Sequence, residues 1–159
     1  MEFLHELLER CAKNDGGGRM NSDSALSLEA KAERLGDVVR FVDKELAAVA
    51  CPGEIVNQIE LAIEEIFLNI SNYAYSGEAG TVTLLLHAIT NEKQPTINIT
   101  ISDQGKPFNP LEHEDPDTTI PLEQRNIGGL GILLVKKMMT SVSYKYENGR
   151  NHLVLSKSW

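Results

Sequence analysis

The stretch that decides the fold is residues 54–75, EIVNQIELAIEEIFLNISNYAY. Its apolar residues recur at helical spacing, which predicts one long α-helix that ends before Ser76-Gly77. At about 100° per residue, most of its apolar side chains share one broad arc, and two leucines lie nearly opposite that arc. The arc holds Ile55, Val56, Ile59, Ile63, Ile66, Phe67 and Ile70, and the opposite positions are Leu61 and Leu68.

Polar side chains lie between these two apolar zones: Gln58, Glu65, Asn69 and Asn72. Glu65 and Asn69 are four residues apart, so both emerge on the same face of the helix. This pattern fits either an exposed polar stripe with one stabilising pair or the wall of a cavity. In a cavity wall, the amide oxygen of Asn69 would coordinate a hard cation such as Mg²⁺. Glu65 would then orient or deprotonate an attacking hydroxyl.

The rest of the chain gives its helices and strands in blocks, which predicts an α+β fold. We expect a two-layer α/β sandwich whose mixed or antiparallel sheet carries its helices on one face. Residues 103–127 show no period and contain four prolines, as is typical of a functional or disordered loop. The expected helices cover 33–50, 54–75 and 129–140, and the expected strands cover 26–30, 81–89, 96–102, 141–146 and 152–157.

Length, composition and charge limit the class of protein. The 159 residues suit one domain with one core, and the formal net charge of -8 disfavours nucleic-acid binding. No apolar run approaches the roughly 20 residues of a membrane span, and no secretory signal is visible, so we expect a cytoplasmic protein. Residues 1–24 are predicted to be an extension with a flexible linker, in which Met20 is a candidate natural start. The domain proper is predicted to be 25–159.

Two glycine-bearing segments could form a nucleotide site with this helix. The first, Asp103-Gln-Gly105, directly follows an expected strand. An Asp at a strand end can accept a hydrogen bond from a nucleobase amino group, and Gly105 would let the backbone approach the base. An ordinary Asx turn that closes the strand would have the same sequence.

The second segment places Gly128, Gly129 and Gly131 at the start of an expected helix. Free amides and the positive helix end make such a start an anion site, although a hinge with tight packing would also explain the glycines. The segment matches neither a Rossmann fingerprint nor a P-loop. Arg125 precedes the glycines and could contact a γ-phosphate, or it could be a surface arginine.

Together, these segments resemble the three boxes of the GHKL ATPases. Residues 65–75 resemble the N box, 103–108 the first glycine box, and 128–135 the second. The resemblance covers about residues 25–157 and is greatest to the compact branch of RsbW-type anti-sigma-factor serine kinases. One departure is Tyr73, which stands where a histidine is frequent in the family.

The resemblance implies a Bergerat ATP-binding fold that uses ATP and Mg²⁺. It implies Asn69 as the metal ligand, Glu65 as the general base and Asp103 as the residue that binds adenine. Gly105 would lie under the base, and residues 109–127 would form a lid from which Arg125 contacts the γ-phosphate. The implied nucleotide-binding set is Asn69, Asp103, Gly105, Phe108, Gly128, Gly129, Leu130 and Gly131.

The resemblance also implies a protein serine/threonine kinase that phosphorylates a STAS-domain antagonist, sequesters a sigma factor and often forms a homodimer. An alternative is a non-catalytic nucleotide-binding module that sequesters a sigma factor or another partner protein. A third possibility is an orphaned fold that no longer binds nucleotide, but the presence of all three boxes argues against it. No phospho-accepting histidine helix is visible in the sequence, so a complete histidine kinase is not expected.

Overall fold

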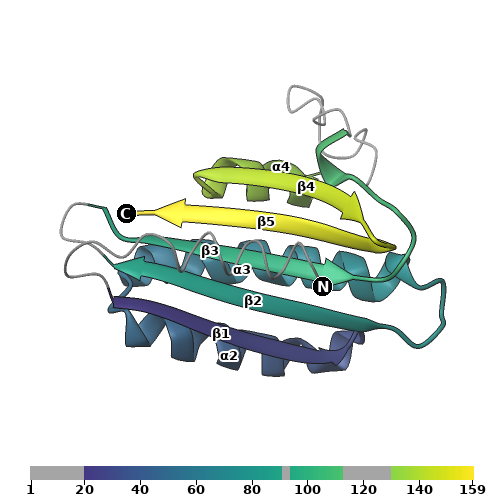
Figure 1. Ribbon diagram of the computed structural model, residues 1–159, viewed down its shortest axis with the longest axis horizontal. Helices are drawn as coiled ribbons and strands as arrows, with labels where there is room; N and C mark the ends of the chain where they lie inside the picture. Colours follow the sequence, from purple (N-terminus) through teal and green to yellow (C-terminus); the bar gives the residue numbers. More distant parts are fainter. Residues whose placement is uncertain (1–19, 91–93, 113–129) are drawn as a thin grey trace, which may run out of the picture.

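The computed structural model describes residues 20–90, 94–112 and 130–159. In these residues, five strands form one antiparallel sheet, and three α-helices lie against one of its faces (Figure 1). The strands are β1 (Met20–Glu29), β2 (Thr81–Thr90), β3 (Thr96–Asp103), β4 (Ser141–Glu147) and β5 (Arg150–Ser158). The helices are α2 (Leu35–Ala48), α3 (Gly53–Asn69) and α4 (Leu130–Met138). The predicted α+β sandwich is confirmed.

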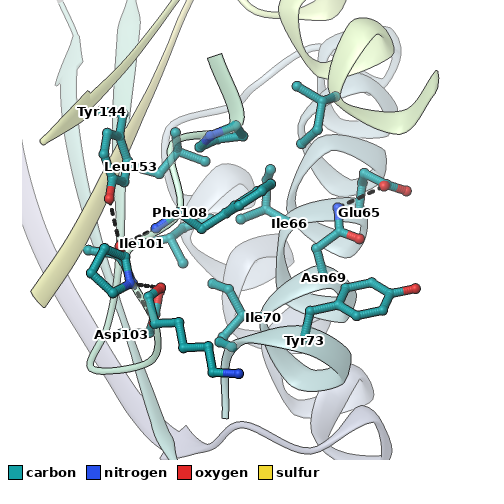
Figure 2. Close-up of a pocket in the computed structure, with 16 residues that line it drawn as sticks. Glu65, Ile66, Asn69, Ile70, Tyr73, Ile101, Asp103, Phe108, Tyr144 and Leu153 are labelled. Atoms are coloured by element: carbon teal, nitrogen blue, oxygen red, sulfur yellow. Dashed lines mark hydrogen bonds between the residues drawn. The ribbon is translucent and has the colours of Figure 1, made fainter. Parts of the chain in front are cut away.

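The strand order in the sheet brings two distant parts of the chain together. The order is β1-β2-β3-β5-β4, so the last strand lies beside β3 in the middle of the sheet. The pairing register places Asp103, at the end of β3, opposite Asn151, near the start of β5. The same end of the sheet faces the last turn of α3 across a cavity (Figure 2).

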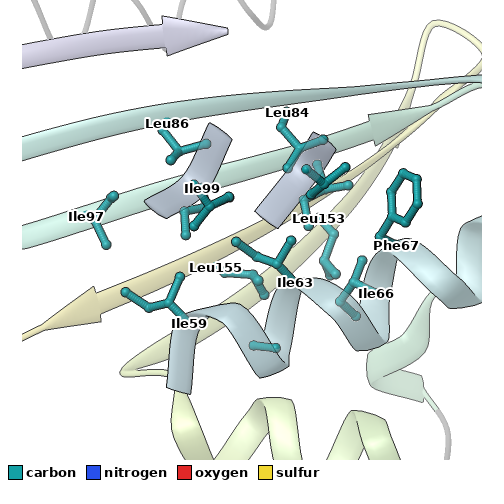
Figure 3. Close-up of a cluster of buried hydrophobic side chains, with 14 of the residues drawn as sticks. Ile59, Ile63, Ile66, Phe67, Leu84, Leu86, Ile97, Ile99, Leu153 and Leu155 are labelled. Atoms are coloured by element: carbon teal, nitrogen blue, oxygen red, sulfur yellow. The ribbon is translucent and has the colours of Figure 1, made fainter. Parts of the chain in front are cut away.

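The core lies between the sheet and the helices (Figure 3). Alternate residues of β3 point toward α3, because successive side chains of a strand face opposite sides of the sheet. Ile97, Ile99 and Ile101 form this row, and Ile63 of α3 packs against it with no exposed surface. The other fully buried large side chains include Phe67, Leu46, Ile59, Leu84, Leu155, Val38, Val42 and Val82. This packing fixes α3, and with it the residues of its final turn.

The helix predicted to run from residue 54 to 75 changes type before its end. The α-helix ends at Asn69, and residues Ile70–Ala74 form a π-helix, η2. The Ser71 hydroxyl donates a hydrogen bond to the Phe67 carbonyl at 2.9 Å. Side-chain bonds to the carbonyl four residues earlier often bend helices, and π turns are frequent at functional sites. The widened turn follows the residue that the sequence singles out as a metal ligand.

Two other boundaries differ from the sequence-based expectation. The first strand begins at Met20 rather than near residue 26, because β1 pairs with β2 along its whole length. The last hairpin has a two-residue turn, Asn148-Gly149, in which both residues have positive φ. Asn-Gly is the preferred pair for such a turn, so β4 and β5 continue into residues expected to be loop. No helix in the described ranges is long and apolar enough to cross a membrane.

Two carboxyl groups face each other between α2 and α3. Asp43 of α2 has a buried Oδ1 atom that accepts no hydrogen bond from any N–H or O–H group of the described residues when Glu60 is ionised. A proton on Glu60 of α3 would satisfy it. The hydrogen bond with Asp43, followed by burial and the charges of Asp43 and Glu64, raises the pKa of Glu60 to about 7. The folded protein therefore holds a proton here that the unfolded chain releases at lower pH.

We expect Glu60→Gln to change the pH dependence of stability. Folding raises the pKa of Glu60 from 4.5 to about 7. Its contribution to the free energy of unfolding is therefore fully present below pH 4.5 and is lost as the pH rises through 7. Glutamine keeps a donor at every pH, so the stability of the variant relative to wild type should increase between about pH 5 and about pH 8. Urea unfolding at both pH values measures this, with exposed Glu78→Gln as the control. A constant difference across the pH range would contradict the assignment.

Candidate functional site

A cavity of about 590 Å³ lies between α3 and the sheet (Figure 2). One wall is the end of α3 with η2, and the other is formed by β3, β4, β5 and the segment that follows Asp103. Its lining is mostly apolar, with a few polar groups, as is common in small-molecule sites. The lining residues are Glu65, Ile66, Asn69, Ile70, Tyr73, Ala74, Ile101, Asp103, Lys106, Pro107, Phe108, Pro110, Ile132, Tyr144, Asn151 and Leu153. The set includes Glu65, Asn69, Asp103 and Phe108, all four predicted from the sequence.

The helical wall carries the pair Glu65 and Asn69. The Asn69 amide donates a hydrogen bond from Nδ2 to Oε1 of Glu65 at 2.9 Å. The amide oxygen of Asn69 accepts no hydrogen bond from the described residues, so it is available to a hard cation. In the described ranges, no group of three or more His, Cys, Asp and Glu side chains could hold a metal ion. A Mg²⁺ ion at Asn69 would therefore take its other ligands from water and a bound phosphate, as this ion often does.

The opposite wall carries Asp103 in a tight turn. Its Oδ1 atom accepts hydrogen bonds from the Gly105 amide at 2.8 Å and from Nδ2 of Asn151 at 2.9 Å. Burial raises the pKa of the Asp103 carboxyl, and these hydrogen bonds oppose the rise. Both bonds end on Oδ1, so Oδ2 has no donor in the described residues and can accept one from a ligand. The segment is both an Asx turn and part of the cavity wall, and the contact of Asp103 with adenine stays a prediction.

Gly105 lies against the end of η2. A Cβ atom at this position would come within 2.5 Å of the Ala74 Cβ and 2.6 Å of the Ala74 carbonyl oxygen. The next residue, Lys106, donates its backbone N–H to that same carbonyl at 3.0 Å. Glycine is therefore required at position 105 because the turn after β3 packs closely against η2. This requirement holds whether or not a ligand also approaches Gly105.

The start of α4 lies against Glu65. A Cβ at Gly131 would come within 2.0 Å of the Glu65 carboxyl carbon, so a side chain at this position would displace the Glu65 carboxylate. The first turn of α4 is thus adjacent to the polar end of the cavity. Leu130, predicted as a nucleotide contact, is 42% exposed and is not among the lining residues. Arg125, Gly128 and Gly129 lie outside the described residues, so their roles stay predictions.

Sequence reasoning missed Asn151, which joins the parts of the sheet wall. It is 6% exposed, and its Nδ2 donates to Oδ1 of Asp103 and to the Lys106 carbonyl at 3.1 Å. Its Oδ1 accepts the Phe108 N–H at 3.2 Å and the Tyr144 hydroxyl at 2.7 Å. One side chain therefore fixes both ends of the turn that follows β3.

A signal for Asn151 was present in the alternation of β5. Asn151 has the same parity as Leu153 and Leu155, which face the core, and opposite parity to Val154. An amide at a core-facing strand position needs buried partners. The strand expected from the sequence begins at residue 152, which leaves Asn151 in the hairpin loop and outside this alternation.

We expect Asn151→Ala to destabilise the fold and to disorder the turn after β3. The change leaves buried donors and acceptors without partners, which should lower the free energy of unfolding by about 2–3 kcal/mol. Urea denaturation measures the change, with Asn57→Ala on the exposed face of α3 as the matched control. A midpoint that equals that of the control would show that the Asn151 hydrogen bonds contribute little.

Comparison with known proteins agrees with this geometry. Residues 28–157 match the family model described as histidine kinase-like ATPase domain. A serine-protein kinase RsbW of Halalkalibacterium halodurans is 27% identical over 129 residues, which cover 78% of this chain and 76% of that protein. The serine/threonine-protein kinase BtrW of Bordetella bronchiseptica is 27% identical over 99 residues, or 62% of this chain and 67% of that protein.

A third relative is a serine-protein kinase RsbW of Listeria monocytogenes, 25% identical over 100 residues. This match covers 60% of this chain and 62% of that protein. The family match includes α2, α3, α4, the cavity and three complete strands, together with the end of β1 and all of β5 except its last residue. The chain belongs to the histidine kinase-like ATPase domain family.

Proposed function

We propose that this chain is a Mg-ATP-dependent protein serine/threonine kinase. The observation that carries the proposal is the placement of Asn69 and Asp103 on opposite walls of one cavity, with Glu65 beside the first turn of α4. The names of the three relatives support the same activity. The ATP phosphates would lie at the Asn69 end of the cavity and the adenine at the Asp103 end.

The adenine end offers a specific hydrogen-bond acceptor in an apolar setting. Oδ2 of Asp103 can accept from the amino group of adenine, and Ile101 and Leu153 supply apolar contacts beside it. Because Asn151 and Gly105 hold Oδ1, the carboxylate is oriented before a ligand arrives. A purine with a carbonyl in place of the amino group would meet two acceptors and bind less well.

The phosphate end offers the groups that phosphoryl transfer needs. Mg²⁺ held by Asn69 would neutralise phosphate charge, and the N-terminal amides of α4 would bind phosphate oxygens. Glu65 would accept the proton of the partner's serine or threonine hydroxyl as its oxygen attacks the γ-phosphorus. The bond from that phosphorus to the β–γ bridging oxygen breaks, which leaves ADP and a phosphorylated partner.

The proposed phosphate acceptor is a STAS-domain antagonist, and the proposed competing partner is a sigma factor. A cytoplasmic homodimer is the form in which we expect the protein to act. The alternative is a non-catalytic module in which the nucleotide only shapes a partner surface. Incubation of the chain with γ-labelled ATP and candidate STAS proteins from the same genome separates the two, because only a kinase labels its partner.

We expect Asn69→Ala to abolish detectable Mg-ATP binding while the fold stays intact. The change removes the only amide oxygen of the helical wall that is available to the metal, so the phosphate charge is no longer neutralised there. Calorimetry measures the affinity, and circular dichroism checks the fold. Asn72→Ala, an exposed amide outside the cavity, is the matched control. Unchanged affinity in Asn69→Ala would falsify the metal role.

We expect Glu65→Gln to bind ATP normally but to lose phosphoryl transfer. Glutamine keeps the shape of the side chain and cannot accept the hydroxyl proton, so the rate should fall by about 10²–10⁴-fold. The rate of label transfer to the STAS partner measures this, and Glu64→Gln, which does not line the cavity, is the control. If wild type and Glu65→Gln label the partner equally fast, Glu65 is not the base.

A further inference from the structure

Tyr75 joins three segments around the cavity without lining it. It follows the π-helix η2, and its hydroxyl donates a hydrogen bond to the Thr81 carbonyl at 2.6 Å. The same oxygen accepts the backbone N–H of Gln104 at 2.9 Å. The ring packs onto Gly80, where a Cβ would come within 2.3 Å of it. A single phenol therefore connects the end of the Asn69-bearing helix, the start of β2 and the turn after β3.

The adjacent residue adds a second connection to the same turn. The Ala74 carbonyl accepts the Lys106 N–H, and Gly105 lies in close contact with Ala74. The turn that begins at Asp103 is thus bonded at Gln104 and at Lys106 to the end of η2. On the other side it is held by Asn151. These contacts set how far Asp103 lies from the wall that carries Asn69.

The hydroxyl of Tyr75 contributes more to the position of the turn than to the stability of the fold. Its two hydrogen bonds are solvent-exposed, so water can replace them if the oxygen is removed, at a small cost in stability. Water cannot reproduce the fixed spacing, because a water molecule is not attached to the Tyr75 ring and so does not tie the two groups to η2. Loss of the oxygen should therefore loosen the turn without unfolding the protein.

We infer that Tyr75 is a positioning residue, whose hydroxyl holds the Asp103 turn in register with η2 and so sets the preference for a 6-aminopurine over a 6-oxopurine. The inference rests on the proposed ATP site. Tyr75 touches none of the bound groups in this arrangement and acts through Gln104 and Asp103. Its effect is on the direction of the Oδ2 acceptor, because a hydrogen bond weakens when its angle departs from linear.

The test compares Tyr75→Phe with wild type for binding of ATP and of inosine triphosphate. Inosine triphosphate carries a carbonyl where ATP carries the amino group, so it cannot donate that hydrogen bond to Asp103. Calorimetry should show ATP binding weakened by about tenfold and inosine triphosphate binding nearly unchanged, which reduces selectivity by about tenfold. Tyr146→Phe makes the same chemical change on exposed β4, outside the cavity, and should leave both affinities unchanged.

The outcomes of this test distinguish failure of the positioning role from failure of the proposed ATP site. Selectivity equal to that of wild type, or an equal loss for both nucleotides, would overturn the positioning role while the ATP site stands. A large drop in the urea midpoint of Tyr75→Phe would show that the hydroxyl supports the fold, which also overturns the inference. Failure of the wild-type chain to bind ATP would instead remove the proposed function on which the inference depends. Faster amide hydrogen exchange at Gln104 in Tyr75→Phe would support it.

Discussion

The buried hydrogen bond between Asp103 and Asn151 is the constraint on which the site depends. Asp103 ends β3, and β5 brings Asn151 beside it because the last strand inserts next to β3 in the sheet. A buried carboxylate is costly unless donors surround it, and Asn151 and the Gly105 amide are those donors. The chain after β3 must therefore fold back over Asn151, which places Phe108 and Lys106 at the cavity.

The second constraint is the close approach of backbone segments at two glycines. Gly105 allows the turn to reach η2, and Gly131 allows the first turn of α4 to reach Glu65. A methyl group at Gly105 would overlap Ala74, so the cavity would have to open at that wall, and a methyl group at Gly131 would displace the Glu65 carboxylate. The sequence predicts both glycines as positions where a ligand could approach the backbone. In the structure they are also places where the protein packs against itself, and both requirements act on the same residues.

Local pattern was sufficient to predict most of the fold. Alternation and turn residues located β2, β3, β4 and β5, and helical periodicity located α2 and α3. The polar face of α3 led to Glu65 and Asn69. Local sequence pattern could not predict contacts between residues far apart in the chain. Asn151 meets Asp103 across 48 positions and Tyr75 meets Gln104 across 29, and no local pattern predicts either pairing. The π turn was missed because it breaks the helical period itself.

The charge of the site explains why a metal ion belongs in the proposed mechanism. The chain has a formal net charge of -8, and two carboxylates, Glu65 and Asp103, lie on the cavity walls. Of the described residues that line the cavity, Lys106 alone carries a cationic side chain, and it lies beside Asp103 rather than Glu65. A triphosphate next to Glu65 would be repelled unless a cation stood between them. Asn69 has the neutral oxygen that can hold such an ion without adding negative charge. In the proposed mechanism, Glu65 and Asn69 would separate two tasks, proton acceptance and metal binding, that a second carboxylate would combine at the cost of phosphate affinity.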